Sequence, residues 1–253
     1  MALLEAHNLK KAFAGRTVVD DVTFHVDRGE IVGLLGRNGA GKTTSFRMTI
    51  GMIDADGGKV LFDGHDVSGL PMYQRARVGM GYLSQEPSIF QRLSCQDNLL
   101  AILETLDLPR TERVRRANEL LAQFGLSHKK DHQARTCSGG ERRKLEIARA
   151  LITKPRLILL DEPFSGVDPI AVEELQEEVR RLAKAGIAIL ITDHNVQQTL
   201  RVCDRAVIID AGKKFAEGMP RDLINDERVK RVYLGSLFRG DEFDAAPAGR
   251  ARI

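Results

Sequence analysis

The 253-residue sequence lacks several features that mark particular classes of protein. Its longest apolar runs, such as residues 157–160 and 187–191, are far too short to span a bilayer. Its first residues lack the basic segment and apolar run of a secretory signal. A net charge of only +3 provides no global field for nucleic acid. We therefore expect no nucleic-acid partner and no direct membrane insertion, so that any membrane role must come through a partner.

Cysteine is also scarce. Cys95, Cys137 and Cys203 have no metal-type spacing and form an odd set, which suits a reducing cytoplasm better than a disulfide framework. Positive charge is concentrated in residues 110–149, which contain eleven Lys or Arg against five Asp or Glu. A solvated helix face and a surface for anionic lipid or an acidic partner both fit this stretch.

Short apolar strands alternate with helical patterns along most of the chain. Partial alternation and β-branched or aromatic content predict strands at 17–26 and 58–62, and buried strands are expected at 30–36, 79–83, 156–161, 187–192 and 205–210. Helices are expected between strands, for example at 42–51 and 169–184. This alternation predicts an α/β fold with a parallel sheet covered by helices.

The pattern changes between about residues 94 and 153. Three helical patterns follow one another there, at 94–106, 111–124 and 138–153, with no strand pattern between them. We expect a helical subdomain at about 90–153, inserted into one domain that covers 1–238. The composition of 239–253 predicts a disordered C-terminal tail.

A glycine-rich loop at residues 36–43 fits the pattern G-x-x-x-x-G-K-[ST]. The expected strand at 30–36 leads into it and a helix follows, which is the context that this motif requires. Its backbone N–H groups would surround phosphates, Lys42 would reach the β- and γ-phosphates, and the Thr43 hydroxyl would hold Mg²⁺. The expected nucleotide contacts of this segment are Gly36, Arg37, Asn38, Gly39, Ala40, Gly41, Lys42, Thr43 and Thr44.

Two adjacent carboxylates end the expected strand at 156–161. Ligands of open α/β sheets bind beyond the carboxyl ends of the strands. We expect Asp161 to hold Mg²⁺ through water and Glu162 to polarise or deprotonate the attacking water. In isolation the pair would be an acidic turn before a helix, but the complete phosphate loop in the same chain favours catalysis.

A second glycine-rich segment begins the expected helix at 138–153. Ser138, Gly139 and Gly140 would let an anion approach the helix N-terminus closely. The same residues with Glu141 also fit a capping box. The interpretation of this segment therefore depends on the other motifs.

Three further candidates each have an ordinary alternative. Gln85 follows the expected strand at 79–83 and could contact the metal or water, or be a surface residue. His194 follows the strand at 187–192 and could contact a γ-phosphate, although a lone histidine is more often structural. Phe13, placed before the first expected strands, could stack on an adenine or pack in the core.

These candidates occur along the chain in the order Phe13, 36–43, Gln85, 138–141, Asp161 with Glu162, Asp168 and His194. In this order they resemble the motifs of the ATP-binding subunits of ABC transporters, over nearly the whole chain to about residue 238. The resemblance implies a P-loop NTPase (RecA-like) core with an N-terminal antiparallel β subdomain and an inserted helical subdomain.

The resemblance also implies a homodimer with ATP at its interface, in which Ser138, Gly139 and Gly140 of one subunit close on the ATP held by the other. Phe13 would stack on the adenine, Gln85 would be the Q-loop glutamine and a Mg²⁺ contact, and Glu162 the catalytic base. Asp168 would be the D-loop aspartate and His194 the switch histidine. The expected catalytic residues are therefore Lys42, Gln85, Glu162 and His194.

Residues 84–90, 166–169, 191–196 and 229–235 resemble more closely the ATPase of the lipopolysaccharide-export system of Gram-negative bacteria. This implies integral membrane subunits as partners and a peripheral position on the cytoplasmic face of the inner membrane. In that family the region of Phe90 forms a groove for a helix of the membrane subunits; the alternative for Phe90 is burial. The chain departs from the family pattern at Cys137 and Gln91, where leucine and a basic residue are usual.

Three other functions share parts of this pattern. The ATPase of a branched-chain amino-acid importer has the same fold. A soluble ABC ATPase acting on nucleic acid or ribosomes usually has two cassettes or a long coiled-coil insertion, whereas 52 residues separate Gln85 from Ser138 here (138 − 85 − 1). A regulatory module without turnover is disfavoured by the intact Asp161 and Glu162.

Overall fold

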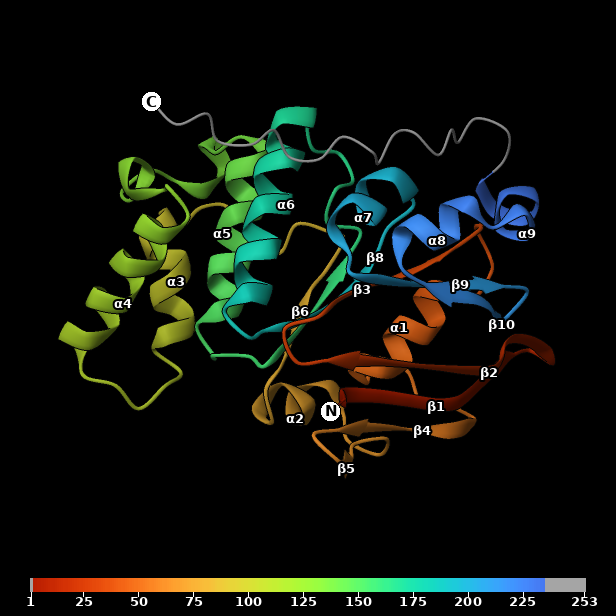
Figure 1. The fold of residues 1–253 in the computed structure, drawn as a ribbon. Coiled ribbons are helices and arrows are strands. Elements are labelled where there is room, and N and C mark those ends of the chain that lie inside the picture. The colour runs from red at the N-terminus through yellow and green to blue at the C-terminus, as the bar shows by residue number, and fades with distance from the viewer. Residues whose placement is uncertain (1, 235–253) are drawn as a thin grey trace.

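The computed structural model describes residues 2–234. They form two sheets (Figure 1). The first has the order β2-β1-β4-β5 and is antiparallel, with β1 Ala2–Phe13, β2 Arg16–Asp27, β4 Gly57–Phe62 and β5 His65–Asp66. The second has the order β10-β9-β3-β8-β7-β6, with β3 Ile31–Gly36, β6 Met80–Leu83, β7 Leu157–Asp161, β8 Ala188–Thr192, β9 Arg205–Asp210 and β10 Lys213–Gly218. All its neighbouring strands are parallel except β10, which pairs with β9 in the antiparallel direction.

Helices cover both faces of the second sheet. Helix α1 lies between the two sheets (Figure 1), and its buried residues join one apolar core with side chains of both. A second core packs α3 to α6 against the opposite face. The helices are α1 Lys42–Ile50, α2 Met72–Arg77, α3 Cys95–Leu103, α4 Arg110–Gln123, α5 Gly139–Leu151, α6 Pro169–Lys184, α7 Val196–Val202, α8 Pro220–Asn225 and α9 Glu227–Val229, with shorter turns at Ser127–Lys129, Ala134–Thr136 and Lys230–Leu234.

Local capping residues set where several helices begin. The Ser94 side chain accepts a hydrogen bond from the backbone N–H of Asp97 at the start of α3. At the start of α6, the Asp168 side chain accepts a hydrogen bond from the backbone N–H of Ala171, and Pro169 occupies the first helical position. Each cap satisfies a backbone donor that has no partner within its own helix. These short signals explain why helix starts could be read from the sequence to within a residue or two.

The expected fold is confirmed: an α/β core with a parallel sheet and an antiparallel β subdomain. Within the described residues, α3, α4 and α5 follow one another between β6 and β7 without a named strand, although the boundaries of a helical subdomain stay a prediction. The predicted tail at 239–253 lies outside the described residues. In the part of the chain that the structure describes, no helix is both long and apolar enough to cross a membrane.

One placement was wrong. Phe13 does not precede the first strands; it is the last residue of β1 and pairs with Arg16 across the turn to β2. Strand β1 was missed because its burial does not alternate regularly. Its pairing with β2 shifts register at several points, and Asn8 has a positive φ of 49°. Such bulges remove the period of two by which a strand is recognised.

Candidate nucleotide site

The loop at 36–43 joins β3, in which all six residues are buried, to the start of α1. Close backbone approach requires glycine at two positions. A Cβ at Gly36 would lie 2.1 Å from the Ile209 carbonyl oxygen, and one at Gly41, where φ is 101°, would lie 2.7 Å from the Val18 carbonyl oxygen. The loop is therefore fixed by its packing against two strands.

The Lys42 side chain lies back over this loop and is almost fully buried. Its ammonium donates to the carbonyl oxygens of Gly36 at 2.6 Å and Arg37 at 2.9 Å. Burial lowers the pKa of Lys42, and the negative charge of Glu162 opposes this shift. The amine is thus held at the loop that is expected to surround the phosphates.

Three predicted residues meet at the ends of neighbouring strands. Gln85 follows β6, Glu162 follows β7, and His194 lies two residues beyond β8. The Gln85 amide nitrogen donates to Oε2 of Glu162 at 2.7 Å, and Nδ1 of His194 lies 3.2 Å from the same oxygen. The predicted catalytic carboxylate, glutamine and histidine therefore form one cluster.

Asp161 lies at the end of β7, next to this cluster, and is 3% exposed. Burial raises the pKa of Asp161, while the hydroxyl of Tyr82 donates to its Oδ2 at 3.3 Å and partly opposes the shift. Carboxylate, hydroxyl and amide oxygens are the ligands that Mg²⁺ prefers, usually with one or two carboxylates and phosphate oxygens of the substrate. The side chains of Asp161, Thr43 and Gln85 carry oxygens of these three kinds, and their role as Mg²⁺ ligands stays a prediction. Residues 2–234 contain no cluster of three or more His, Cys, Asp or Glu that could hold a metal alone.

The second glycine-rich segment forms the predicted capping box at the start of α5. The Ser138 hydroxyl accepts from the N–H of Glu141 at 3.1 Å, and the Glu141 carboxylate accepts from the N–H of Ser138 at 2.8 Å. Gly140 is required by packing, because a Cβ there would lie 2.7 Å from Cβ of Ala171 on α6. Ser138 and Gly139 remain exposed. In Figure 1, α5 lies apart from α1, the helix that follows the first glycine-rich segment.

Two predicted aromatic contacts are on the surface. Phe13 is 46% exposed and Phe90 is 45% exposed, so the alternative of burial in a core is wrong for both. The Lys11 ammonium lies 5.6 Å from the Phe13 ring centroid, and the Arg149 guanidinium lies 5.3 Å from that of Phe90. Each ring therefore lies beside a cation and keeps almost half of its surface accessible.

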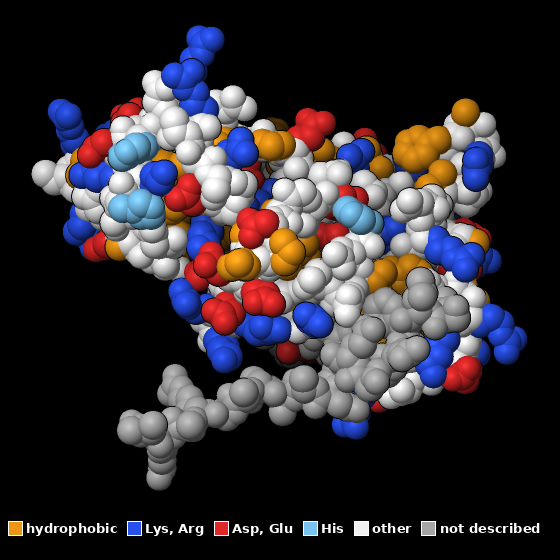
Figure 2. Space-filling view, turned by 90° about the horizontal axis from the view of Figure 1, so that it is seen from above, with side chains coloured by type: hydrophobic (Ala, Val, Ile, Leu, Met, Phe, Trp, Pro, Cys, Tyr) orange, Lys and Arg blue, Asp and Glu red, His pale blue; other side chains and the backbone are white. Residues whose placement is uncertain are grey.

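The basic stretch at 110–149 has partners within the chain. On α4, Arg115 pairs with Glu112 and Glu119, and Arg116 pairs with Glu112 at 2.7 Å. Figure 2 shows Lys and Arg interspersed with Asp and Glu on the face seen there, without one continuous basic area. This arrangement fits a solvated helix face.

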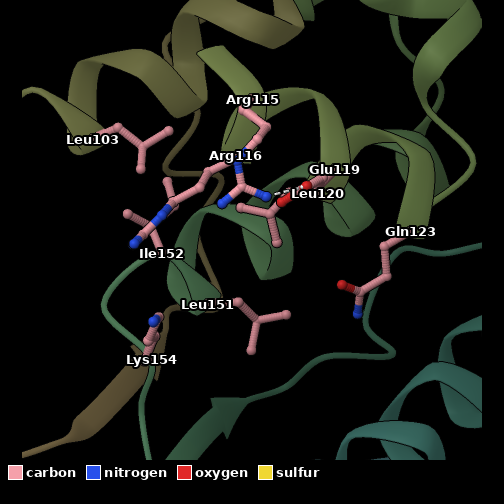
Figure 3. Close-up of a pocket in the computed structure, with 9 residues that line it drawn as sticks. All are labelled: Leu103, Arg115, Arg116, Glu119, Leu120, Gln123, Leu151, Ile152 and Lys154. Atoms are coloured by element: carbon pink, nitrogen blue, oxygen red, sulfur yellow. Dashed lines mark hydrogen bonds and ion pairs between the residues drawn. The ribbon is translucent and has the colours of Figure 1, made fainter. Parts of the chain in front are cut away.

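A cavity of about 290 Å³ lies beside these arginines, between α3, α4 and the end of α5 (Figure 3). Its lining is partly aliphatic and partly charged: Leu103, Arg115, Arg116, Glu119, Leu120, Gln123, Leu151, Ile152 and Lys154. Among the described residues, none of the side chains that line this cavity is an expected contact of ATP or Mg²⁺. The cavity is therefore separate from the nucleotide site.

One functional candidate was missed by sequence reasoning. Asp193, directly after β8, is completely buried and accepts two backbone hydrogen bonds, from Phe164 and Asn195. Burial raises the pKa of Asp193, and these two hydrogen bonds oppose the shift. An aspartate after a strand gives no local signal of burial, and its contact with Phe164 spans 29 residues of sequence.

Comparison with known proteins identifies the class that this fold and site define. The ABC transporter family model matches residues 19–165, and the chain belongs to that family. The chain is 53% identical over 240 residues to the lipopolysaccharide export system ATP-binding protein LptB of Escherichia coli K12, covering 94% of this chain and 100% of that protein. It is 52% identical over 240 residues to LptB of Haemophilus influenzae, with the same coverage.

A solved structure agrees in fold. The ADP-bound form of MJ1267, an ATP-binding cassette of an ABC transporter, superposes with a TM-score of 0.84 at 28% identity, covering 93% of this chain and 99% of that one. The chain is thus an ATP-binding ABC transporter subunit, and its reaction is ATP hydrolysis coupled to transport.

Proposed function

We propose that this chain is the ATPase subunit of a lipopolysaccharide-export transporter and drives extraction of lipopolysaccharide from the inner membrane toward the outer membrane. The observation that carries this proposal is the 53% identity to Escherichia coli LptB over the whole length of that protein. The chain would act on the cytoplasmic face of the inner membrane, bound there through integral membrane subunits.

The active form in this proposal is a homodimer that binds ATP at its interface. The exposed Ser138 and Gly139 of one subunit would contact ATP held by the loop at 36–43 of the other. The separation of α5 from α1 within one chain supports this arrangement (Figure 1).

Hydrolysis would begin with a water placed against Glu162. Gln85 and His194 fix Oε2 of Glu162, which leaves the carboxylate oriented to accept a proton from that water. Lys42 and the partner's Ser138 would stabilise charge on the transferring phosphoryl group. Thr43, Asp161 and Gln85 would hold Mg²⁺, which neutralises phosphate charge when bound.

The membrane subunits would dock beside Phe90. The same segment, up to Ser88, helps to line a cavity of about 410 Å³, whose lining residues are Arg47, Met52, Tyr82, Ser84, Gln85, Glu86, Pro87, Ser88 and Asp161. Because this lining includes Gln85, a helix inserted here would lie against a residue that contacts Glu162. Docking and hydrolysis would thus be linked through one side chain.

Co-purification tests the transporter assignment. The full chain would be isolated with its partners from detergent-solubilised membranes of its own organism and the partners identified by mass spectrometry. We expect the membrane subunits of a lipopolysaccharide exporter. Recovery of amino-acid permease subunits without exporter subunits would refute the proposal, and tight, salt-resistant binding of nucleic acid would favour a soluble ABC ATPase instead.

A further inference from the structure

We propose that Asp193 is a positioning residue for ATP hydrolysis: its carboxylate holds the segment that carries Glu162 and the segment that carries His194 in one fixed arrangement. The inference rests on the proposed role of Glu162 as the catalytic base. It adds a residue that contacts neither the phosphates nor the water and acts through two residues that do.

Both oxygens of the Asp193 carboxylate are engaged. Oδ2 accepts from the backbone N–H of Phe164 at 3.0 Å, and Oδ1 accepts from the backbone N–H of Asn195 at 2.8 Å. The first bond crosses to the segment that follows Glu162, and the second closes the turn that contains His194. Because the side chain is fully buried, water does not compete for either bond.

The backbone of Glu162 explains why this connection matters. Its φ is 47°, in the left-handed region that a residue with a Cβ rarely adopts and that persists only where surrounding contacts enforce it. The N–H of Glu162 donates to the Thr192 carbonyl oxygen at 2.7 Å. Two residues further on, Asp193 holds Phe164. The strained residue is therefore fixed on both sides by the same turn, 192–195.

The side chains around Asp193 support the same role. Nδ1 of His194 lies 3.5 Å from Oδ1 of Asp193 and 3.2 Å from Oε2 of Glu162. The imidazole thus lies between the two carboxylates. If the turn at 192–195 moved, both the ring and the Glu162 backbone would lose their present positions together.

An amide could not replace this carboxylate. Asparagine has one acceptor oxygen, so its NH₂ group would face one of the two backbone N–H groups and leave it without a partner. Asp193→Asn therefore removes one connection while changing the side-chain volume very little. A matched control is Asp204→Asn, because Asp204 also accepts a backbone N–H, from Ile31 at 2.9 Å, but lies away from Glu162.

The test measures steady-state ATP hydrolysis by the full purified chain for wild type, both asparagine variants, His194→Ala and the double variant. We expect Asp193→Asn to lower kcat about tenfold or more with KM for ATP changed less than about twofold. Because Asp193 acts through His194 and Glu162, the kcat of the double variant should be no lower than that of the less active of the two single variants. Asp204→Asn should stay within about twofold of wild type.

Two results separate this inference from the proposed function. If Glu162→Gln abolishes turnover while Asp193→Asn hydrolyses like wild type, the positioning role is wrong and the base remains. If Glu162→Gln hydrolyses normally, the base assignment fails and the inference fails with it. If Asp193→Asn does not bind ATP or fold, Asp193→Ser provides a second variant with one acceptor, and failure of both to fold would assign Asp193 to stability alone.

Discussion

Two donors converge on one oxygen of Glu162, at 2.7 Å from the Gln85 amide nitrogen and 3.2 Å from the His194 ring nitrogen. A carboxylate held at Oε2 by Gln85 and His194 has Oε1 outside these two contacts. The geometry thus separates the oxygen that is positioned from the oxygen that would accept a proton. It also explains why an amide in place of this carboxylate would preserve the shape of the site but not its chemistry.

We expect Glu162→Gln to bind ATP with near wild-type affinity but to turn it over more slowly by a factor of about 10² to 10⁴, because glutamine cannot accept the proton of water. Phosphate release and binding of a fluorescent ATP analogue measure the two properties separately. Glu104→Gln, at the end of α3, is the matched control and should behave as wild type. Wild-type hydrolysis by the Glu162 variant would sink the assignment.

For single residues, local motifs indicated Lys42, Glu162 and His194 as candidates, because each has a fixed place relative to a strand or loop. The structure brings Glu162 and His194 into contact, and the roles of all three stay predictions. Asp193 was not found, because its significance depends on burial and on Phe164, which is near only in the folded chain. Similarly, nothing in the sequence around Tyr82 indicates that its hydroxyl reaches Asp161.

Among the elements, α1 is constrained at both ends. Its start follows Gly41 in the phosphate loop, and its end is closed by Gly51, whose φ is 80°. A buried arginine on α2 adds a further constraint, since Arg75 is 2% exposed and its guanidinium donates to four main-chain carbonyls. Its acceptors are the carbonyl oxygens of Met48, Thr49, Ser68 and Leu70, at 2.7 to 2.8 Å.

Replacing Arg75 with methionine should lower the free energy of unfolding by about 3 kcal/mol, because buried carbonyls at the end of α1 would lose charged donors. Urea unfolding followed by circular dichroism measures the change. Arg77→Met, on the same helix but exposed, should change it by less than about 0.5 kcal/mol. Equal effects of the two substitutions would show that Arg75 does not fix the end of α1.

The elements differ in how far they could be predicted. The buried parallel strands and the helices α1 and α3 to α6 were located to within a few residues, since apolar runs, the glycine-rich loop and helix caps are local signals. The short elements α2, α7, α8, α9 and β5 were not predicted, and neither were strands β1 and β10. Strand β10 is as long as β9 but only partly buried, and Lys213, Lys214 and Glu217 interrupt the apolar run that marks its neighbours. Helix α2 has six residues, too few to establish a helical period.

For the whole molecule, the proposed dimer makes each ATP site depend on two chains. We therefore expect Lys42→Ala and Ser138→Arg to be inactive separately but to regain hydrolysis when mixed. Random pairing makes half of the dimers mixed, and each mixed dimer has one intact site of two, so about a quarter of wild-type activity should return. Phosphate release measured after mixing, against each variant at the same total concentration, provides the test. No gain on mixing would mean that the sites are not shared.

Helix α5 joins the two places where this chain would meet other chains. It starts at the exposed Ser138 cap, and in its last turn Arg149 binds the Ser88 carbonyl oxygen at 2.7 Å and stacks over Phe90. Thirteen residues make a rod of about 20 Å, too short and too regular to bend appreciably. A movement of one end of α5 would therefore move the other end with it. Closure of the dimer and movement of the membrane subunits would then be one rigid displacement, with no relay of successive contacts along the helix.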